Sequence, residues 1–145
     1  MRHEDCIFCK IIHGEMPSAK VYEDDHVYAF LDISQVTKGH TLVIPKTHTK
    51  DLYETSSEVA GELFARVPKI ANAIKKVYKP VGINLLNNNE KPAGQAVFHL
   101  HIHIIPRYGE DDGFSFEGKS HTDDYTPEDL QVIAQDISEG VMSEN

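Results

Sequence analysis

One segment of the chain carries apolar residues at the spacing of an amphipathic helix. Its apolar members are Val59, Leu63, Val67, Ile70 and Ile74. Thr55, followed by Glu58 three residues later, resembles a capping box at the start of this segment. The pattern predicts one long helix from Thr55 to Tyr78. Pro68 lies inside it and lacks a backbone donor, so we expect a kink or a break there.

Shorter alternating or apolar runs, each bounded by turn residues, predict the strands of a sheet. They are residues 20–23, 27–33, 41–44, 82–87 and 97–106. Residues 6–12 predict a short helical turn, and Thr126 with Pro127 marks the start of a C-terminal helix. The predicted fold class is α+β: a mainly antiparallel sheet, one long helix and a C-terminal helix.

Length and charge narrow the possible functions. The 145 residues fit one domain, in which residues 108–124 read as an irregular loop. Fourteen Lys and Arg against 23 Asp and Glu give a net charge of -9, which opposes a nucleic-acid-binding face. A small phosphate ligand can still be held locally by backbone N–H groups. No signal peptide or membrane span is recognisable, so we expect a soluble cytoplasmic protein without a membrane partner.

Three histidines alternate with apolar residues near position 100. In a strand, His99, His101 and His103 would form one row, with neighbouring histidines roughly 6–7 Å apart, while the residues between them face the core. A single such histidine is usually an ordinary polar surface residue, but three in strict alternation favour chemistry. Parallel side chains suit one tetrahedral metal ion poorly, although one of them can join ligands from elsewhere.

Cys6 and Cys9 form a C-x-x-C motif. The spacing alone is compatible with a redox pair, half of a metal site or coincidence. A thioredoxin-like role would place the motif after a strand in a βαβ unit, and no such strand precedes it. The context therefore favours metal binding over redox chemistry.

The segment His-Leu-His-Ile-His-Ile-Ile at residues 99–105 resembles the histidine-triad family. The resemblance runs from Cys6 to about Arg107 and includes Asp32-Ile33, residues 39–45 and Gly94-Gln95 in the expected order. It implies a histidine-triad fold in a homodimer, with a core over residues 1–110 and a loop and helix over residues 111–145. It also implies reaction at the α-phosphorus of a nucleotide.

The resemblance assigns catalytic roles to four histidines. It makes His101 the nucleophile, which forms a nucleotidyl-histidine intermediate that water then cleaves. His40 and the backbone carbonyl of His99 would orient His101, and His103 would contact the phosphate or the leaving group. Relatives that transfer nucleotides resemble a pattern with Gln at the third position, so His103 favours hydrolysis.

The resemblance also implies a nucleotide pocket. Asp32 would bind the ribose, since a carboxylate accepts hydrogen bonds from both hydroxyl groups. The residues expected around the purine base are Ile7, Phe8, Ile11, Phe30 and Leu42. The expected phosphate loop contains Asn88, Gly94 and Gln95. Ala96 stands where many relatives carry Ser, which puts the leaving-group preference in doubt.

A structural zinc site is expected from the same resemblance. Some members pair the two cysteines with two histidines, which here are His48 and His99, and two thiolates with two imidazoles suit tetrahedral Zn²⁺. The remaining histidines are expected at the surface. They are His3, His13, His26 and His121.

Three functions follow from these features. The first is hydrolysis of purine nucleoside 5′-phosphoramidates or related nucleoside monophosphate adducts. The second is hydrolysis of dinucleoside polyphosphates, as in the fragile-histidine-triad branch. A hypothesis of another class is a non-catalytic nucleotide sensor or a zinc-dependent interaction protein.

Overall fold

The structure, a computed structural model, is described here for residues 3–143. These residues divide into two units, the first ending at Phe114 and the second beginning at Ser115. The first unit contains the sheet, the helices α1 and α2 and the predicted site. The second contains a short 3-10 turn and the helix α3. The expectation of a single domain over the whole chain stays a prediction.

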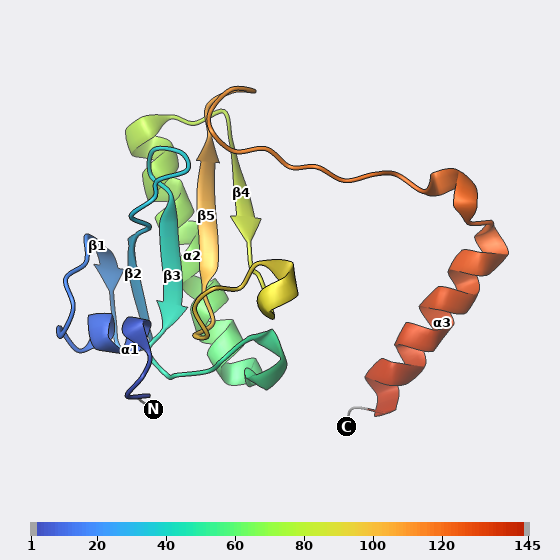
Figure 1. The fold of residues 1–145 in the computed structure, drawn as a ribbon, viewed down its shortest axis with the longest axis horizontal. Helices are drawn as coiled ribbons and strands as arrows, with labels where there is room; N and C mark the ends of the chain where they lie inside the picture. Colours follow the sequence, from blue (N-terminus) through green and yellow to red (C-terminus); the bar gives the residue numbers. More distant parts are fainter. Residues whose placement is uncertain (1–2, 144–145) are drawn as a thin grey trace. The chain divides into compact units, whose positions relative to one another are not determined.

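Five strands form one sheet in the first unit. They are β1 (Lys20–Glu23), β2 (Val27–Leu31), β3 (Thr41–Pro45), β4 (Gly82–Leu86) and β5 (Ile102–Arg107). Their order across the sheet is β1-β2-β3-β5-β4, and each neighbouring pair is antiparallel. Figure 1 shows this arrangement. The α+β prediction with a mainly antiparallel sheet is confirmed.

The two faces of the sheet are covered by different helices (Figure 1). α2 (Ser57–Tyr78) packs on one face, and the short α1 (Ile7–Ile12) packs on the other. The cluster on the α2 side consists of Val27, Ala29, Val43, Leu63, Val67, Ile70, Ile74, Leu100, Ile102 and Ile104. The cluster on the α1 side consists of Cys6, Phe8, Cys9, Ile11, Tyr28, Phe30, Leu42 and Ile44. Alternation along β5 puts His103 on the side opposite the α2 cluster, and ring contacts with Phe8 of α1 show that His99 and His101 lie on the α1 side.

The long helix begins two residues later than the sequence predicted. Ser56, not Thr55, is the N-cap, and its hydroxyl accepts a hydrogen bond from the backbone N–H of Val59. The Thr55 hydroxyl instead donates to the carbonyl of Asp51, at 2.6 Å, so it is unavailable for capping. The helix is not broken at Pro68 and continues to Tyr78.

Two predicted strands have different ends in the structure. β2 ends at Leu31 because Asp32 starts a turn, in which its carboxylate accepts hydrogen bonds from the backbone and hydroxyl of Ser34. β5 begins at Ile102, where pairing with Val43 of β3 begins, so the predicted start at residue 97 is wrong. Of the three histidines, His103 alone is therefore in a strand. The inward alternation of Leu100, Ile102 and Ile104 still holds.

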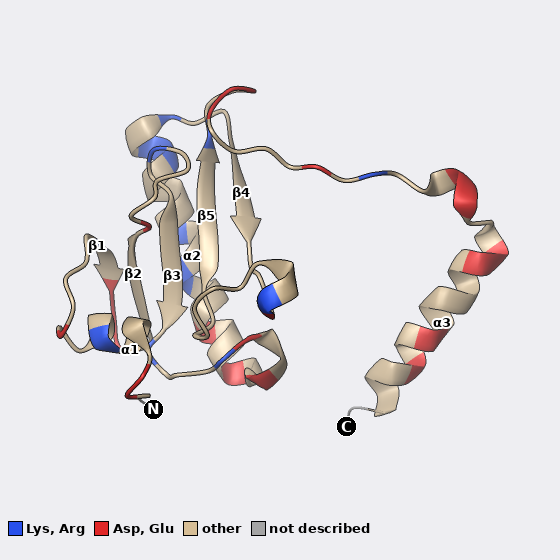
Figure 2. Cartoon of the chain, in the orientation of Figure 1, with Lys and Arg blue, Asp and Glu red and all other residues tan. Residues whose placement is uncertain are grey.

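The C-terminal helix α3 (Pro127–Ser143) begins as the sequence predicted. Thr126 and Asp129 exchange two hydrogen bonds, each side chain accepting from the other's backbone N–H, which is a reciprocal capping arrangement. Figure 2 shows that α3 carries acidic residues but neither Lys nor Arg. Within residues 3–143, no helix has the length and apolar character needed to cross a membrane.

The packing of α2 predicts a position-dependent loss of stability. Leu63 has no exposed surface, whereas its neighbour Phe64 is 49% exposed. We expect Leu63→Ala to lower the free energy of unfolding by about 2–5 kcal/mol, because it leaves a cavity between α2 and the sheet. The matched change Phe64→Ala should cost less than about 1 kcal/mol. Urea unfolding followed by circular dichroism measures both, and equal losses would contradict this account of the core.

Candidate functional site

His101 lies immediately before β5 with its ring on the α1 side of the sheet. Its Nδ1 is 2.7 Å from the backbone carbonyl of His99, and its ring packs edge-on against Phe8, with centroids 5.2 Å apart. A carbonyl oxygen only accepts, so Nδ1 carries the proton and Nε2 holds a lone pair. Burial lowers the pKa of His101, an effect partly opposed by the hydrogen bond to His99. The neutral, nucleophilic form of the ring is therefore favoured.

The backbone around His101 is held by a residue that the sequence did not single out. The Asn87 side-chain amide donates to the carbonyl of His101, at 3.0 Å. Asn89 in turn donates to the Asn87 side-chain oxygen, at 2.6 Å. Asn87 therefore helps to fix the position of the histidine that the resemblance makes the nucleophile.

His103 is hydrogen-bonded to His40. His40 Nε2 and His103 Nδ1 are 2.9 Å apart. The hydrogen-bond partner of His40 is therefore His103, whereas the resemblance implied that His40 orients His101. Within the described chain, the buried Nδ1 of His40 has no partner. A buried acceptor without a partner costs less than a buried donor without one, so we assign the His40 proton to Nε2, which then donates to His103. His103 consequently carries its own proton on Nε2, away from His40.

Burial favours the neutral form of both rings in this pair, although the nearby Asp32 carboxylate opposes it. Burial, the largest cause, and the nearby His101 and His40 lower the pKa of His103 to about 4. Asp32 Oδ2 lies 3.8 Å from His40 Nε2. Partial burial raises the pKa of Asp32, but hydrogen bonds from Ser34 and the nearby histidines lower it more, so the net shift is downward. Asp32 thus remains a carboxylate beside two neutral imidazoles.

Gln35 fastens the loop that carries Asp32 and His40. Its side-chain amide donates to the carbonyls of both residues, at 2.7 Å each, and its side-chain oxygen accepts from the backbone N–H of Gly39, at 2.9 Å. Its backbone is in the left-handed region, with φ of 42°, which is uncommon for a residue with a Cβ. Sequence reasoning missed Gln35 because nothing local signals these contacts.

An apolar cavity of about 700 Å³ is lined by Phe8, whose ring packs against that of His101. Its wall includes Asp32 at one side and all five residues that the resemblance placed around the base, which are Ile7, Phe8, Ile11, Phe30 and Leu42. These residues come from α1, β2 and β3, so the strand pairing of β2 with β3 and the packing of α1 on them build the cavity. A cavity of this size and character suits a flat apolar ring.

The predicted phosphate loop is held from within. Gln95 is buried, and its side-chain amide donates to the carbonyls of Lys50 and Val97 while its oxygen accepts from the backbone N–H of Glu90. Gly94 has φ of 103° and lies against Asn88, so a side chain at this position would be strained. The side chain of Gln95 therefore shapes the loop, in which the backbone N–H groups of Gly94 and Gln95 also donate, to the carbonyls of Lys91 and Glu90.

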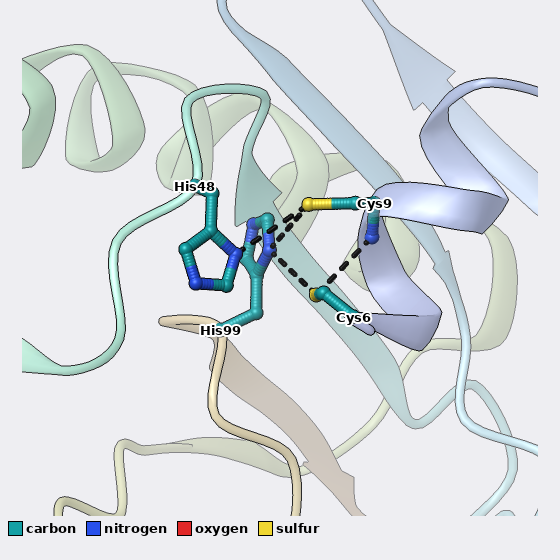
Figure 3. A group of neighbouring side chains, drawn as sticks. All are labelled: Cys6, Cys9, His48 and His99. Atoms are coloured by element: carbon teal, nitrogen blue, oxygen red, sulfur yellow. Dashed lines mark hydrogen bonds between the residues drawn. The ribbon is translucent and has the colours of Figure 1, made fainter. Parts of the chain in front are cut away.

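The four residues predicted for zinc come together on the α1 side of the sheet (Figure 3). Cys6 Sγ is 3.3 Å from His99 Nδ1, and Cys9 Sγ is 3.4 Å from His48 Nδ1 and 3.7 Å from His99 Nδ1. The four ligand atoms all lie within 4.8 Å of one another. We call these four residues the Cys-His cluster.

The Cys-His cluster fits a tetrahedral metal ion. Metal–sulfur and metal–nitrogen bonds of about 2.3 and 2.0 Å separate neighbouring ligand atoms by roughly 3.3–3.8 Å, which is the range of the contacts above. His99 Nε2 bonds the carbonyl of Pro45, at 2.8 Å, which fixes its tautomer and leaves the Nδ1 lone pair facing the sulfurs. Burial lowers the pKa of His99 to about 4, so the ring is neutral, as a ligand must be.

The histidines expected at the surface are exposed in the structure. They are His3, His13, His26 and His121. His3 nevertheless stacks on His48, with ring centroids 4.8 Å apart, and its backbone N–H donates to Cys9 Sγ, at 3.3 Å. His3 thus adjoins the Cys-His cluster, a position that the sequence did not suggest.

A comparison with known protein families identifies the family of the chain. Residues 13–110 match the HIT domain. The chain belongs to the HIT family. It is 63% identical to "Protein hit" of Bacillus subtilis over 140 residues, which cover 97% of each chain. A crystal structure of a HIT family protein from Bacillus anthracis superposes with a TM-score of 0.92 at 61% identity, over 94% of this chain and 97% of that one.

Three further relatives carry functional descriptions in their names. Adenosine 5′-monophosphoramidase hnt1 of Schizosaccharomyces pombe is 39% identical, covering 92% of this chain and 96% of that protein. Adenylylsulfatase HINT3 of Arabidopsis thaliana is 50% identical over 74% of this chain but only 54% of that protein. A zinc-bound histidine triad family protein from Mycobacterium smegmatis is 38% identical, with a TM-score of 0.72 over 82% of this chain and 86% of that one.

The contacts of Gln35 predict a specific loss of stability. We expect Gln35→Leu to lower the free energy of unfolding by about 1–3 kcal/mol, because the carbonyls of Asp32 and His40 each lose one of two donors and the N–H of Gly39 loses its acceptor. The same change at the exposed Gln131 of α3 is the matched control and should cost less than about 0.5 kcal/mol. Chemical unfolding measures both variants, and a Gln35→Leu protein as stable as the control would show that the loop does not depend on these bonds.

Proposed function

We propose that the chain is a nucleotide hydrolase that acts at the α-phosphorus of purine nucleoside 5′-phosphoramidates and related nucleoside monophosphate adducts. The observation that carries this proposal is the state of His101. Its Nδ1 proton is committed to the His99 carbonyl, which leaves the Nε2 lone pair free to attack. The ring of the neutral His103 lies beside it, and Phe8, which packs against His101, lines an apolar cavity whose wall also includes Asp32.

The proposed reaction has two steps. His101 Nε2 attacks the α-phosphorus, the bond from phosphorus to the leaving group breaks, and a nucleotidyl-histidine forms. The His40–His103 pair would take up one proton as the anionic substrate binds, the His103 Nε2 proton then passes to the leaving group, and the pair returns to its neutral state. Water then attacks the phosphorus, its proton returns to His103, and the nucleoside monophosphate leaves with His101 restored. The division into two displacements lowers each barrier.

The substrate is placed by the residues around the apolar cavity. The base would lie between α1 and the apolar side chains of β2 and β3, and the ribose hydroxyls would bind the Asp32 carboxylate. The backbone N–H groups that follow Gln95 would bind the phosphate, because those of Gly94 and Gln95 already donate to carbonyls within the loop. Gln35 and Gln95 are positioning residues in this scheme, because their side chains bond the protein backbone.

The names of two relatives support an adenylyl substrate. One is called an adenosine 5′-monophosphoramidase and the other an adenylylsulfatase. Both names specify an adenosine monophosphate group, while the leaving groups differ. This agrees with a site that holds the nucleoside firmly. The homodimer and the cytoplasmic location expected from the sequence stay predictions.

We also propose that the Cys-His cluster holds one structural Zn²⁺. The ion would be bound by Cys6, Cys9, His48 and His99, and its four protein ligands would leave no position open for a substrate. The zinc-bound relative from Mycobacterium smegmatis supports the proposal. When bound, the ion would supply a cross-link between α1 and the segment that precedes β5, and no step of the reaction passes through it.

Substitution of His101 tests the enzymatic proposal. We expect His101→Ala to lower kcat for adenosine 5′-phosphoramidate by about 10³-fold or more, because the nucleophile is removed. The affinity for AMP should change less than about threefold, since the cavity is intact. The exposed His121→Ala is the matched control and should turn over like the wild type. Unchanged turnover in His101→Ala would contradict the role of His101 as nucleophile, and a wild-type protein that binds AMP without turnover would favour nucleotide sensing.

The same assay distinguishes the two hydrolase functions. Wild-type protein is compared on adenosine 5′-phosphoramidate and on a diadenosine polyphosphate, with kcat/KM measured for each. We expect the phosphoramidate to be preferred, because the cavity has one apolar slot lined by α1 and the sheet. A higher kcat/KM for the diadenosine polyphosphate would support the alternative.

Removal of the metal ligands tests the zinc proposal. Elemental analysis should find about one zinc per wild-type chain, and the Cys6→Ser/Cys9→Ser variant should lose both the zinc and several degrees of Tm, because metal binding is coupled to folding. His13→Ala, which changes an exposed histidine near the same helix, should keep both. Wild-type protein that is free of metal and fully stable would contradict the proposal.

A further inference from the structure

A second cavity, of about 570 Å³, lies against the Cys-His cluster. Its walls include Cys6 and His48 of the cluster, together with His3, Asp5, Lys50 and Ala96. The reaction proposed above uses neither this cavity nor the reactivity of the thiols. The cavity is large enough for water and small solutes, so it gives them a route to the Cys6 sulfur, whose residue is 7% exposed in the structure. Cys9, at 1%, is reached through Cys6.

The two sulfurs are placed for a bond to each other. Both cysteines are free, and their Sγ atoms lie within 4.8 Å. Cys6 is the N-cap of α1, and its side chain folds over the first turn, where Sγ accepts from the backbone N–H of Cys9, at 3.3 Å. A disulfide needs an S–S length of about 2.05 Å and Cα atoms about 4.4–6.8 Å apart. Residues three positions apart across the first helical turn meet that requirement with side-chain rotation alone.

We propose that Cys6 and Cys9 are a site of reversible disulfide formation, and that the disulfide and the metal ion are alternative states of one cluster. Hydrogen peroxide is the oxidant class that the cavity admits. The Cys6 sulfur attacks a peroxide oxygen, the O–O bond breaks, and Cys6 sulfenic acid and water form. The Cys9 sulfur then attacks the Cys6 sulfur, the S–O bond breaks, and a second water leaves. Two sulfurs lose one electron each, and one peroxide becomes two waters.

The disulfide changes the surroundings of His99. A disulfide sulfur is neither a thiolate ligand nor a donor, so His48 and His99 lose their sulfur partners and the metal ion has no site. The Nδ1 of His99, a residue with no exposed surface, then becomes a buried acceptor without a donor. The backbone carbonyl of His99 orients His101. On the proposed function, oxidation therefore lowers turnover by about tenfold, the usual effect of disturbing such a support.

The experiment oxidises the zinc-bound wild-type protein with hydrogen peroxide and follows three quantities. Released zinc is measured with a chromogenic chelator, free thiols are alkylated and counted by peptide mass spectrometry, and turnover of adenosine 5′-phosphoramidate is assayed. We expect one zinc released for each Cys6–Cys9 disulfide formed within a chain, with turnover falling in parallel. Dithiothreitol followed by zinc should restore all three. Zinc added after peroxide, without dithiothreitol, should not bind.

A matched variant separates metal from thiol. His48→Ala keeps both cysteines but removes one ligand, so it should form the disulfide at lower peroxide than the wild type, and added zinc should protect it less. Zinc release with both cysteines still alkylated, oxidation to sulfinic acid that dithiothreitol does not reverse, or disulfides between chains would each overturn the proposal. Unchanged turnover in the oxidised protein would overturn the link to His101.

The direct readouts stand apart from the proposed function. If the reduced, zinc-bound protein does not hydrolyse the phosphoramidate, the proposed function fails, while the zinc and disulfide measurements still decide the state of the Cys-His cluster. If it does hydrolyse the phosphoramidate and forms no disulfide, the inference drawn here fails alone.

Discussion

The hydrogen bond from His101 Nδ1 to the backbone carbonyl of His99 is the contact on which the site depends. It fixes the tautomer of His101 through the main chain of His99. The position of the His101 lone pair therefore depends on the position of the His99 backbone. That backbone is held in turn by its own ring, which reaches the carbonyl of Pro45 and the two sulfurs. Site and cluster are thus joined through one residue.

The arrangement of the site follows from a sheet whose two faces are packed differently. The face against α2 is closed by apolar side chains from every central strand, which sets the register of β3 and β5 and hence the side to which the histidines point. Over the other face lies the six-residue α1. A short helix leaves room at its edges, where the two cavities described above and the Cys-His cluster lie.

The sequence predicted the elements that have a periodic apolar pattern. It did not predict the element ends that depend on contacts between residues far apart in the sequence. Inward alternation of Leu100, Ile102 and Ile104 was evident from the spacing, but the start of β5 depends on pairing with Val43, which no local pattern reports. The N-cap of the long helix is Ser56 and not Thr55, because the Thr55 hydroxyl donates to the carbonyl of Asp51.

The site shows the same division. The residues carried by the family motifs lie together, as the cavity wall and the Cys-His cluster show. The partner of His40 could not be read from the motif, since it depends on the register of β3 against β5, which sets Leu42 opposite His103. Gln35 was missed for another reason. Its role depends on a left-handed backbone conformation and on hydrogen bonds to main-chain atoms, and neither can be recognised from the residue type.

The polar side chains that line the nucleotide cavity constrain what the site can distinguish. Ser18 bonds the Tyr28 hydroxyl, Gln35 is committed to backbone atoms, and Asp32 lies at the end expected to hold the ribose. On the proposed function, the base would therefore meet mainly apolar surface within the described lining, which selects for shape and size more than for the hydrogen-bonding edge. Discrimination between substrates must then arise at the phosphate and the leaving group. Ala96 follows the expected phosphate loop without a hydroxyl, so on this proposal the proton for the leaving group would come from His103, supported by its hydrogen bond to His40.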